Sequence, residues 1–209
     1  MRYLALAALI ALLCVLVGCG STVPGPTPEL GADSPAAVRT FYGVADTYLW
    51  QAQPNSNYSW SLKLHCGSNP RGKALRTLVR FNLTKVPATA RVTRATLTLF
   101  VSQVNRTAST YEVHAVTKAW TESGATWTRN ASSYDPKVVA KQAIAPALVG
   151  KFVSFDVTSL AQTWVSSPSK NLGCLLRGVE GNSATEVVFN SRRQFTPSRR
   201  PRLELTYSR

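Results

Sequence analysis

The sequence predicts an all-β domain, an antiparallel, jelly-roll-like β-sandwich with one short helix. Three observations support this fold class. Apolar and polar residues alternate over short segments, which is the pattern of strands with one buried and one solvated face. Clusters of Gly, Pro, Asn and Ser separate these segments. Only one stretch carries apolar residues at helical spacing.

The alternation is clearest in residues 95–101, where Ala95, Leu97, Leu99 and Val101 fall on one face. About ten such strands joined by short turns are typical of an antiparallel sandwich. The other clear segments are residues 76–81, 153–157 and 202–207, and the turns are residues 66–70, 87–88, 123–124, 178–181 and 196–198.

The expected helix begins near Thr158, whose hydroxyl is suited to cap it. Its apolar stripe would pack against the core and consists of Leu160, Ala161, Trp164 and Val165.

Residues 1–18 are predicted to be a signal peptide. Arg2 precedes an apolar run that is too short to span ~30 Å of hydrocarbon comfortably. The run ends in Leu16-Val17-Gly18-Cys19, which resembles the lipobox of bacterial lipoproteins. The resemblance implies that Cys19 carries lipid and anchors the protein at the cell envelope. The alternative is an ordinary signal peptide cut near Gly20 or Ser21, which would give a secreted protein.

Residues 19–42 are rich in Pro, Gly, Ser and Thr and are predicted to be a tether, with the folded domain at residues 43–209. Once Cys14 leaves with the signal peptide and Cys19 is lipidated, Cys66 and Cys174 remain. Outside the cytoplasm such a pair is expected to form a disulfide. The alternative is two buried, unlinked thiols, and the spacing does not fit a zinc site.

Charge suggests the class of ligand. The chain has 24 Lys and Arg against 10 Asp and Glu, a net charge of +14. Such a field concentrates polyanions, and the predicted export points to extracellular or envelope polysaccharides rather than intracellular nucleic acid. The alternative is that the basic surface reflects composition only. Six arginines fall within the last eighteen residues: Arg192, Arg193, Arg199, Arg200, Arg202 and Arg209.

Arg76 and Arg80 are the first candidate ligand-binding residues. They fall on the same side of their strand, roughly 13 Å apart, and guanidinium groups match carboxylates or sulfates through paired hydrogen bonds. The competing interpretation is that they form structural ion pairs with Glu204, Asp156 or another acid.

Aromatic residues give the second candidate site. Trp50 and Trp60 flank the polar loop of residues 51–59, with Tyr58 inside it and Lys63 close by. An aromatic pair beside a polar loop is a candidate platform for pyranose rings, although one ring of the pair would serve equally well to plug the end of the sandwich. The remaining tryptophans are predicted to be core residues: Trp120, Trp127 and Trp164.

No catalytic residues and no cofactor are predicted. Glu112 and Glu122 lie on different segments, whereas a glycosidase needs two carboxylates about 5–10 Å apart. His65 and His114 lack the sequence context of a nucleophile. A polysaccharide-active enzyme would become plausible if Glu112 or Glu122 met another carboxylate in a cleft.

Several motifs together resemble the DNRLRE domain, also grouped as carbohydrate-binding module family 96. Two positions depart from its pattern, since Arg193 stands where glutamate is usual and Ser59 where glycine is usual. The motifs are Asp46-Thr47-Tyr48, Asn57-Tyr58, residues 75–83, residues 95–99, Trp120-Thr121-Glu122 with Thr126-Trp127, residues 153–158 with Trp164, residues 189–192 and residues 201–207.

The resemblance implies a jelly-roll-like sandwich that binds polysaccharide, in some members an anionic one such as alginate, with calcium as a possible structural ion. We therefore predict a lipid-anchored, non-catalytic module that binds an anionic polysaccharide. The alternatives are a structural or adhesive envelope protein with a protein partner, and a polysaccharide-active enzyme.

Overall fold

The computed structural model describes residues 36–181 and 184–209. The predicted signal peptide and the lipidation site Cys19 lie outside the described residues. Within them, no helix combines the length and the apolar character needed to cross a bilayer.

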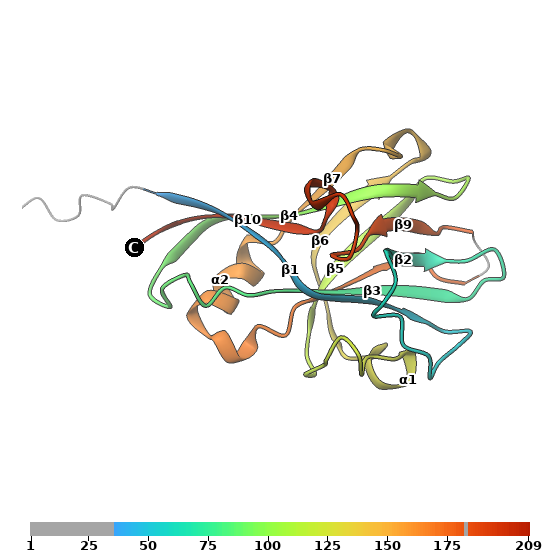
Figure 1. The fold of residues 1–209 in the computed structure, drawn as a ribbon, viewed down its shortest axis with the longest axis horizontal. Helices are drawn as coiled ribbons and strands as arrows, with labels where there is room; N and C mark the ends of the chain where they lie inside the picture. Colours follow the sequence, from blue (N-terminus) through green and yellow to red (C-terminus); the bar gives the residue numbers. More distant parts are fainter. Residues whose placement is uncertain (1–35, 182–183) are drawn as a thin grey trace, which may run out of the picture. The chain divides into compact units, whose positions relative to one another are not determined.

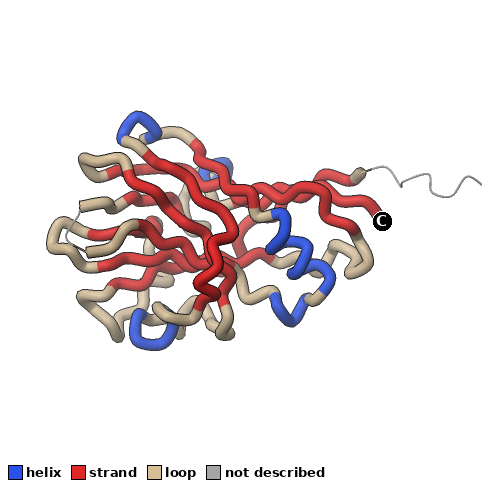
Figure 2. The backbone as a smooth tube through the Cα atoms, turned by 180° about the vertical axis from the view of Figure 1, so that it is seen from behind, coloured by secondary structure: helices blue, strands red, loops and turns tan. Residues whose placement is uncertain are grey.

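Strands make up the body of the described chain, and the helical turns lie at its periphery (Figures 1 and 2). Every strand pair is antiparallel. The predicted all-β class is confirmed. The strands are β1 (Ala37–Trp50), β2 (Lys63–Ser68), β3 (Ala74–Phe81), β4 (Arg91–Val104), β5 (Ser109–Val116), β6 (Tyr134–Ile144), β7 (Phe152–Asp156), β8 (Cys174–Gly178), β9 (Val187–Asn190) and β10 (Arg202–Ser208).

Six strands form a closed hydrogen-bonded ring in the order β1, β10, β4, β9, β2, β3 and back to β1. β8, β5 and β6 extend the sheet from β3, and β7 pairs with β4. The ring closes because two long strands change partners along their length. β1 leaves β10 for β3 at a bulge beside Gly43, and β4 leaves β10 for β9 before a bulge beside Val101. The jelly-roll sandwich stays a prediction.

The alternation in residues 95–101 predicted which side chains of β4 are buried, and this prediction is confirmed. Ala95, Leu97, Leu99 and Val101 are all buried in the main core, which fills the space between the strands. The predicted face of β4 is therefore the inner one.

β3 is covered on both faces, which its alternating sequence does not reveal. Val79 and Phe81 face the main core, whereas Leu78 packs into a second cluster with Trp120. Trp120 belongs to residues 117–134, a segment that lies over the outer face of β3. The face predicted to be open is thus a packed one.

Helix α2 (Thr158–Ser166) is confirmed, and all four residues of its predicted stripe are buried. Its N-cap is Val157, however, and not Thr158. The Thr158 Oγ1 accepts a hydrogen bond from the Ala95 N–H (2.9 Å), while Asp156 Oδ1 accepts from the Thr158 N–H (2.9 Å). The other helical elements were not predicted, because they are too short to show a period: α1 (Trp127–Asn130), η1 (Pro146–Leu148), η2 (Pro168–Lys170) and η3 (Pro197–Arg199).

β1 begins within the predicted tether. Residues 37–42 pair in register with β10, although residues 38–40 are exposed. Strand β1 therefore begins before residue 43, where the folded domain is predicted to start. Backbone pairing extends the strand beyond the part that the core covers, and exposed residues carry no alternation to reveal it.

The predicted disulfide between Cys66 and Cys174 is absent, because both cysteines are buried free thiols. The strands that carry the two cysteines, β2 and β8, pair with the same edge of β3, but the cysteines lie at different positions along it. Cys174 pairs with Val79, and the register of β2 places Cys66 level with Arg76. Three strand positions amount to roughly 10 Å, whereas a disulfide needs Cα atoms within about 7 Å.

We therefore propose a thiol titration on a Cys19→Ser variant that lacks the signal peptide, carried out without reductant. We expect no reactive thiol in the folded protein and two reactive thiols in denaturant. Burial raises the pKa of the Cys174 thiol to about 12, which also suppresses its reactivity. Dithiothreitol should leave the melting temperature unchanged. A denatured chain with no reactive thiol before reduction would show that the two sulfurs are linked.

Candidate functional site

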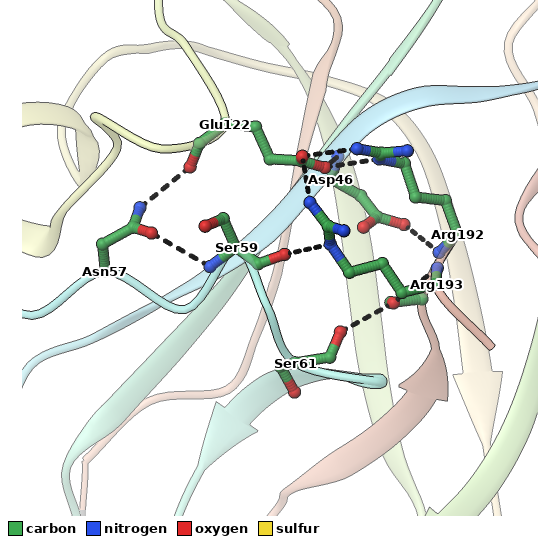
Figure 3. Close-up of polar contacts among 8 residues, drawn as sticks. Asp46, Asn57, Ser59, Ser61, Glu122, Arg192 and Arg193 are labelled. Atoms are coloured by element: carbon green, nitrogen blue, oxygen red, sulfur yellow. Dashed lines mark hydrogen bonds and ion pairs between the residues drawn. The ribbon is translucent and has the colours of Figure 1, made fainter.

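Glu122 is the centre of an ion cluster that joins three distant segments (Figure 3). Its Oε1 accepts hydrogen bonds from the Asp46 backbone N–H (2.9 Å) and from Arg192 Nε (2.5 Å). Its Oε2 accepts from Arg192 Nη2 (2.6 Å) and from Arg193 Nη2 (3.0 Å). One carboxylate thus ties β1 to the loop that follows β9.

The carboxyl group of Asp46 lies beside this cluster and is almost fully buried. Its Oδ2 accepts a hydrogen bond from the Arg192 backbone N–H (2.6 Å). Burial raises the pKa of Asp46 to about 7, against the opposing effect of that hydrogen bond. Burial also acts to raise the pKa of Glu122, but hydrogen bonds from Arg192 and Asp46 outweigh it and hold that pKa below its usual value.

The two carboxylates do not resemble a hydrolytic pair. Both oxygens of Glu122 are engaged by guanidinium groups, and Asp46 is 1% exposed, so that it cannot reach a sugar. A calcium ion also fits poorly here, because guanidinium groups already occupy the Glu122 oxygens and Asp46 is buried. Among the described residues, no three His, Cys, Asp or Glu side chains gather as a metal site.

The histidines are also engaged within the fold. His65 Nδ1 lies 2.6 Å from Glu186 Oε1, and the ring packs against Tyr48. His114 is buried, with its Nδ1 2.9 Å from the Asp135 carbonyl oxygen. Neither ring is presented to a substrate beside a nucleophile.

Trp60 is the most exposed of the predicted ligand-binding residues, at 80%. The Arg193 guanidinium lies 4.2 Å from the centre of its ring, a cation–π contact. Arg193 is itself fixed by Glu122 and by the Ser59 carbonyl oxygen, which accepts from its Nε at 2.5 Å. The glutamate cluster therefore sets where the Trp60 ring is held.

Trp50 does not form a platform with Trp60. Trp50 is half-buried and lies 6.3 Å from Tyr58, whose ring stacks on Tyr48 at 4.2 Å. The Tyr58 hydroxyl donates to Gln53 Oε1 (2.7 Å). Trp50 and Tyr58 thus pack the base of the loop, and of the predicted pair only Trp60 offers its ring to solvent.

Lys63 lines a cavity of about 300 Å³ together with Arg199. Its Nζ donates to Asn190 Oδ1 (2.9 Å), and the Arg199 guanidinium lies 4.7 Å from the Phe100 ring centre. Burial and the neighbouring charge of Arg199 lower the pKa of Lys63. No acidic residue lines this cavity.

Trp60 and Arg193 do not line this cavity, but each is close in the chain to a residue that does. Lys63 pairs with Asn190 across β2 and β9, and Arg193 lies three residues beyond Asn190. We call Trp60, Lys63, Arg193 and Arg199 the basic surface. Sequence reasoning named Trp60 and Lys63 but counted the two arginines only as part of a basic terminus.

The predicted pair of Arg76 and Arg80 does not stand on an open sheet face. Arg76 makes two hydrogen bonds to Glu180 (2.7 and 2.8 Å) and lies over the rings of Trp127 and Tyr134. The partner acid is therefore neither Asp156 nor Glu204. Arg80 has no acidic partner among the described residues, and its guanidinium contacts Trp120. The segment 117–134 contacts both arginines, but Arg80 also lines a cavity.

The predicted core tryptophans are placed as expected in two cases. Trp120 and Trp164 are buried, and Trp127 is half-buried beneath Arg76.

A family model matches most of the described chain. The model of carbohydrate-binding module family 96 matches residues 37–207, which include all ten strands described above except the last residue of β10. No curated protein matches the chain.

The raised pKa of Asp46 predicts a pH-dependent stability. Because the folded pKa (about 7) exceeds the unfolded value of 3.8, the native state holds a proton that the unfolded state has lost between these values. The stability from Asp46 is therefore full below pH 4 and is lost as the pH rises toward 7. Each unit of raised pKa corresponds to about 1.4 kcal/mol.

We expect the Asp46→Asn variant to gain stability relative to wild type between pH 4.5 and pH 8, measured by urea unfolding. Asp135→Asn is the matched control, since Asp135 is exposed and accepts only a local backbone hydrogen bond. An equal difference between Asp46→Asn and wild type at both pH values would show that the folded pKa of Asp46 is not raised.

Proposed function

The chain belongs to carbohydrate-binding module family 96, and on that premise we propose that it binds an anionic polysaccharide outside the cytoplasm through the basic surface. The supporting observations are the cavity in which Lys63 and Arg199 lie together, with no acidic residue among its described lining, and the exposed ring of Trp60, three residues before Lys63 in the chain. Binding, rather than bond cleavage, is the proposed activity.

The charges of the cavity favour an acidic sugar over a neutral one. Burial and then the charge of Arg199 lower the pKa of Lys63, so a ligand that brings negative charge between the two cations offsets both effects. A uronate carboxylate or a sulfate ester accepts hydrogen bonds from both ammonium and guanidinium groups, and such charge-assisted bonds are stronger than neutral ones. A neutral sugar leaves the repulsion in place.

Trp60 supplies the apolar contact that a sugar ring needs. One part of the indole is held by Arg193 and 80% of the residue is exposed. The apolar C–H face of a pyranose packs on such a ring, while its charged substituent extends toward Lys63. Arg193, which stands in place of the glutamate usual in the family, is paired with Glu122 and supports the Trp60 ring.

We further propose that the module is held at the cell envelope by lipid on Cys19, with the residues that follow it serving as a tether. Two or three acyl chains provide a stable anchor where one is marginal. A binding module in this position would retain an acidic polysaccharide at the surface of the cell.

Affinity electrophoresis in gels containing alginate or pectate tests the site. The double variant Lys63→Ala/Arg199→Ala should lose retardation by about tenfold or more in Kd, since each lost charge-assisted contact is worth roughly 1.5–3 kcal/mol. Trp60→Ala should weaken binding without changing its dependence on salt.

The matched control is Lys137→Ala/Arg91→Ala, which removes the same net charge from exposed positions on β6 and β4. It should bind almost as wild type does, apart from the small general effect of charge. The proposal fails if wild type is retarded by no charged polysaccharide at low salt. The assigned site fails if the control pair weakens binding as much as the cavity pair.

A further inference from the structure

We propose that the module has a second polyanion-binding site, a groove centred on Arg80, so that one module holds two acidic polysaccharide chains. The inference rests on the proposed function for the class of ligand, but it concerns a different surface and different residues. We call this surface the Arg80 groove.

The groove is built from three cavities, two of which share lining residues. The first, of about 440 Å³, is lined by Arg39 and Lys85, and the second, of about 570 Å³, by Arg80. Asn82 and Thr84 line both, so these two cavities are neighbours.

The third cavity, of about 400 Å³, is lined by Lys118, Arg129 and Trp120. It is linked to the second through a side-chain contact. Arg80 lines the second cavity, its Nη1 donates to the Trp120 carbonyl oxygen (3.3 Å), and its guanidinium lies 5.3 Å from the Trp120 ring centre. The groove therefore runs from the start of β1, past the end of β3, to helix α1.

The charge along the groove is of one sign. No acidic residue lines any of the three cavities. None of the cations that line them forms an ion pair among the described residues. Arg76, on the same strand as Arg80, is by contrast neutralised by Glu180. The unpaired cations are Arg39, Arg80, Lys85, Lys118 and Arg129.

Arg80 is held ready for a ligand. Trp120 is buried and fixed by a hydrogen bond from its Nε1 to the Leu172 carbonyl oxygen (2.7 Å), and Arg80 lies over this ring. Next to Leu172, Asn171 also lines the second cavity, and its Oδ1 has no hydrogen-bond partner among the described residues. A guanidinium donor and an amide acceptor in one cavity suit the acidic group and the hydroxyl of one sugar residue.

Three consecutive cationic cavities favour a linear polymer over a small anion. A small anion fills one cavity, whereas a chain with a charge on each residue contacts all three and gains from each contact. The groove ends at α1, and the Lys63–Arg199 cavity lies beside Phe100, which pairs with Phe152 of β7. Figure 1 shows α1 and β7 at opposite edges of the molecule. One polymer chain on each surface makes the module a cross-linker.

The test combines stoichiometry and cross-linking. Calorimetric titration with a short alginate oligosaccharide should give two sites per wild-type module, and one site for either Lys63→Ala/Arg199→Ala or Lys85→Ala/Arg129→Ala. Both pairs remove exposed or half-buried cations, and Arg80→Gln serves as a third variant at the centre of the groove. Thermal melting verifies that each variant folds.

With long alginate at low salt, wild type should produce turbidity from cross-linking, and so should the control Lys137→Ala/Arg91→Ala. Each single-site variant should bind the polymer without producing turbidity. One site in wild type, with groove variants that bind and cross-link as wild type does, would overturn the second site and leave the proposed function intact. Absence of binding in wild type would instead overturn the proposed function itself.

Discussion

The bond network of Glu122 is the interaction on which the rest of the structure depends. A single carboxylate holds the backbone of β1, the guanidinium of Arg192 and the guanidinium of Arg193. Through Arg193 it fixes the position of Trp60, and through Arg192 it lies against the buried Asp46. Because opposite charges are satisfied at this point, the loop after β9 is held where it brings Arg199 near Lys63.

The scarcity of acids explains why cations remain available elsewhere. Among the described residues, all ion pairs are made by four glutamates: Glu112, Glu122, Glu180 and Glu186. These glutamates pair with the two histidines and with four arginines, in contacts within the fold. Six of the remaining cations line cavities with no acidic residue among their described lining: Arg39, Lys63, Lys85, Lys118, Arg129 and Arg199. A large positive charge is therefore divided into a paired, structural part and an unpaired part that a polyanion can use.

The sequence predicted those features that depend on local pattern. Alternation located the inner face of β4, and helical spacing located the buried stripe of α2, because each reports the burial of neighbouring residues. The same pattern did not reveal that Arg76 is paired with Glu180 or that Arg80 packs on Trp120, since it shows that two side chains share a face but not that another segment lies over it. The segment 117–134 that does so has little periodicity of its own.

The sequence also could not show which residues far apart in the chain meet in the fold. The cluster of Asp46, Glu122 and Arg192 joins residues that are 70 to 146 positions apart, and no spacing in the sequence indicates that they meet. For the cysteines, by contrast, the sequence predicted a contact that the fold does not make. A shared compartment favours a disulfide, but the register of β2 and β8 along β3 separates the two sulfurs.

A crystal structure with an acidic oligosaccharide bound tests the central claim most directly. The account predicts a carboxylate of the sugar between Lys63 and Arg199, with an adjoining ring against Trp60. An oligosaccharide that leaves this cavity unfilled and binds instead in the polar cavity lined by Gln142, Asp156 and Gln162 would contradict it.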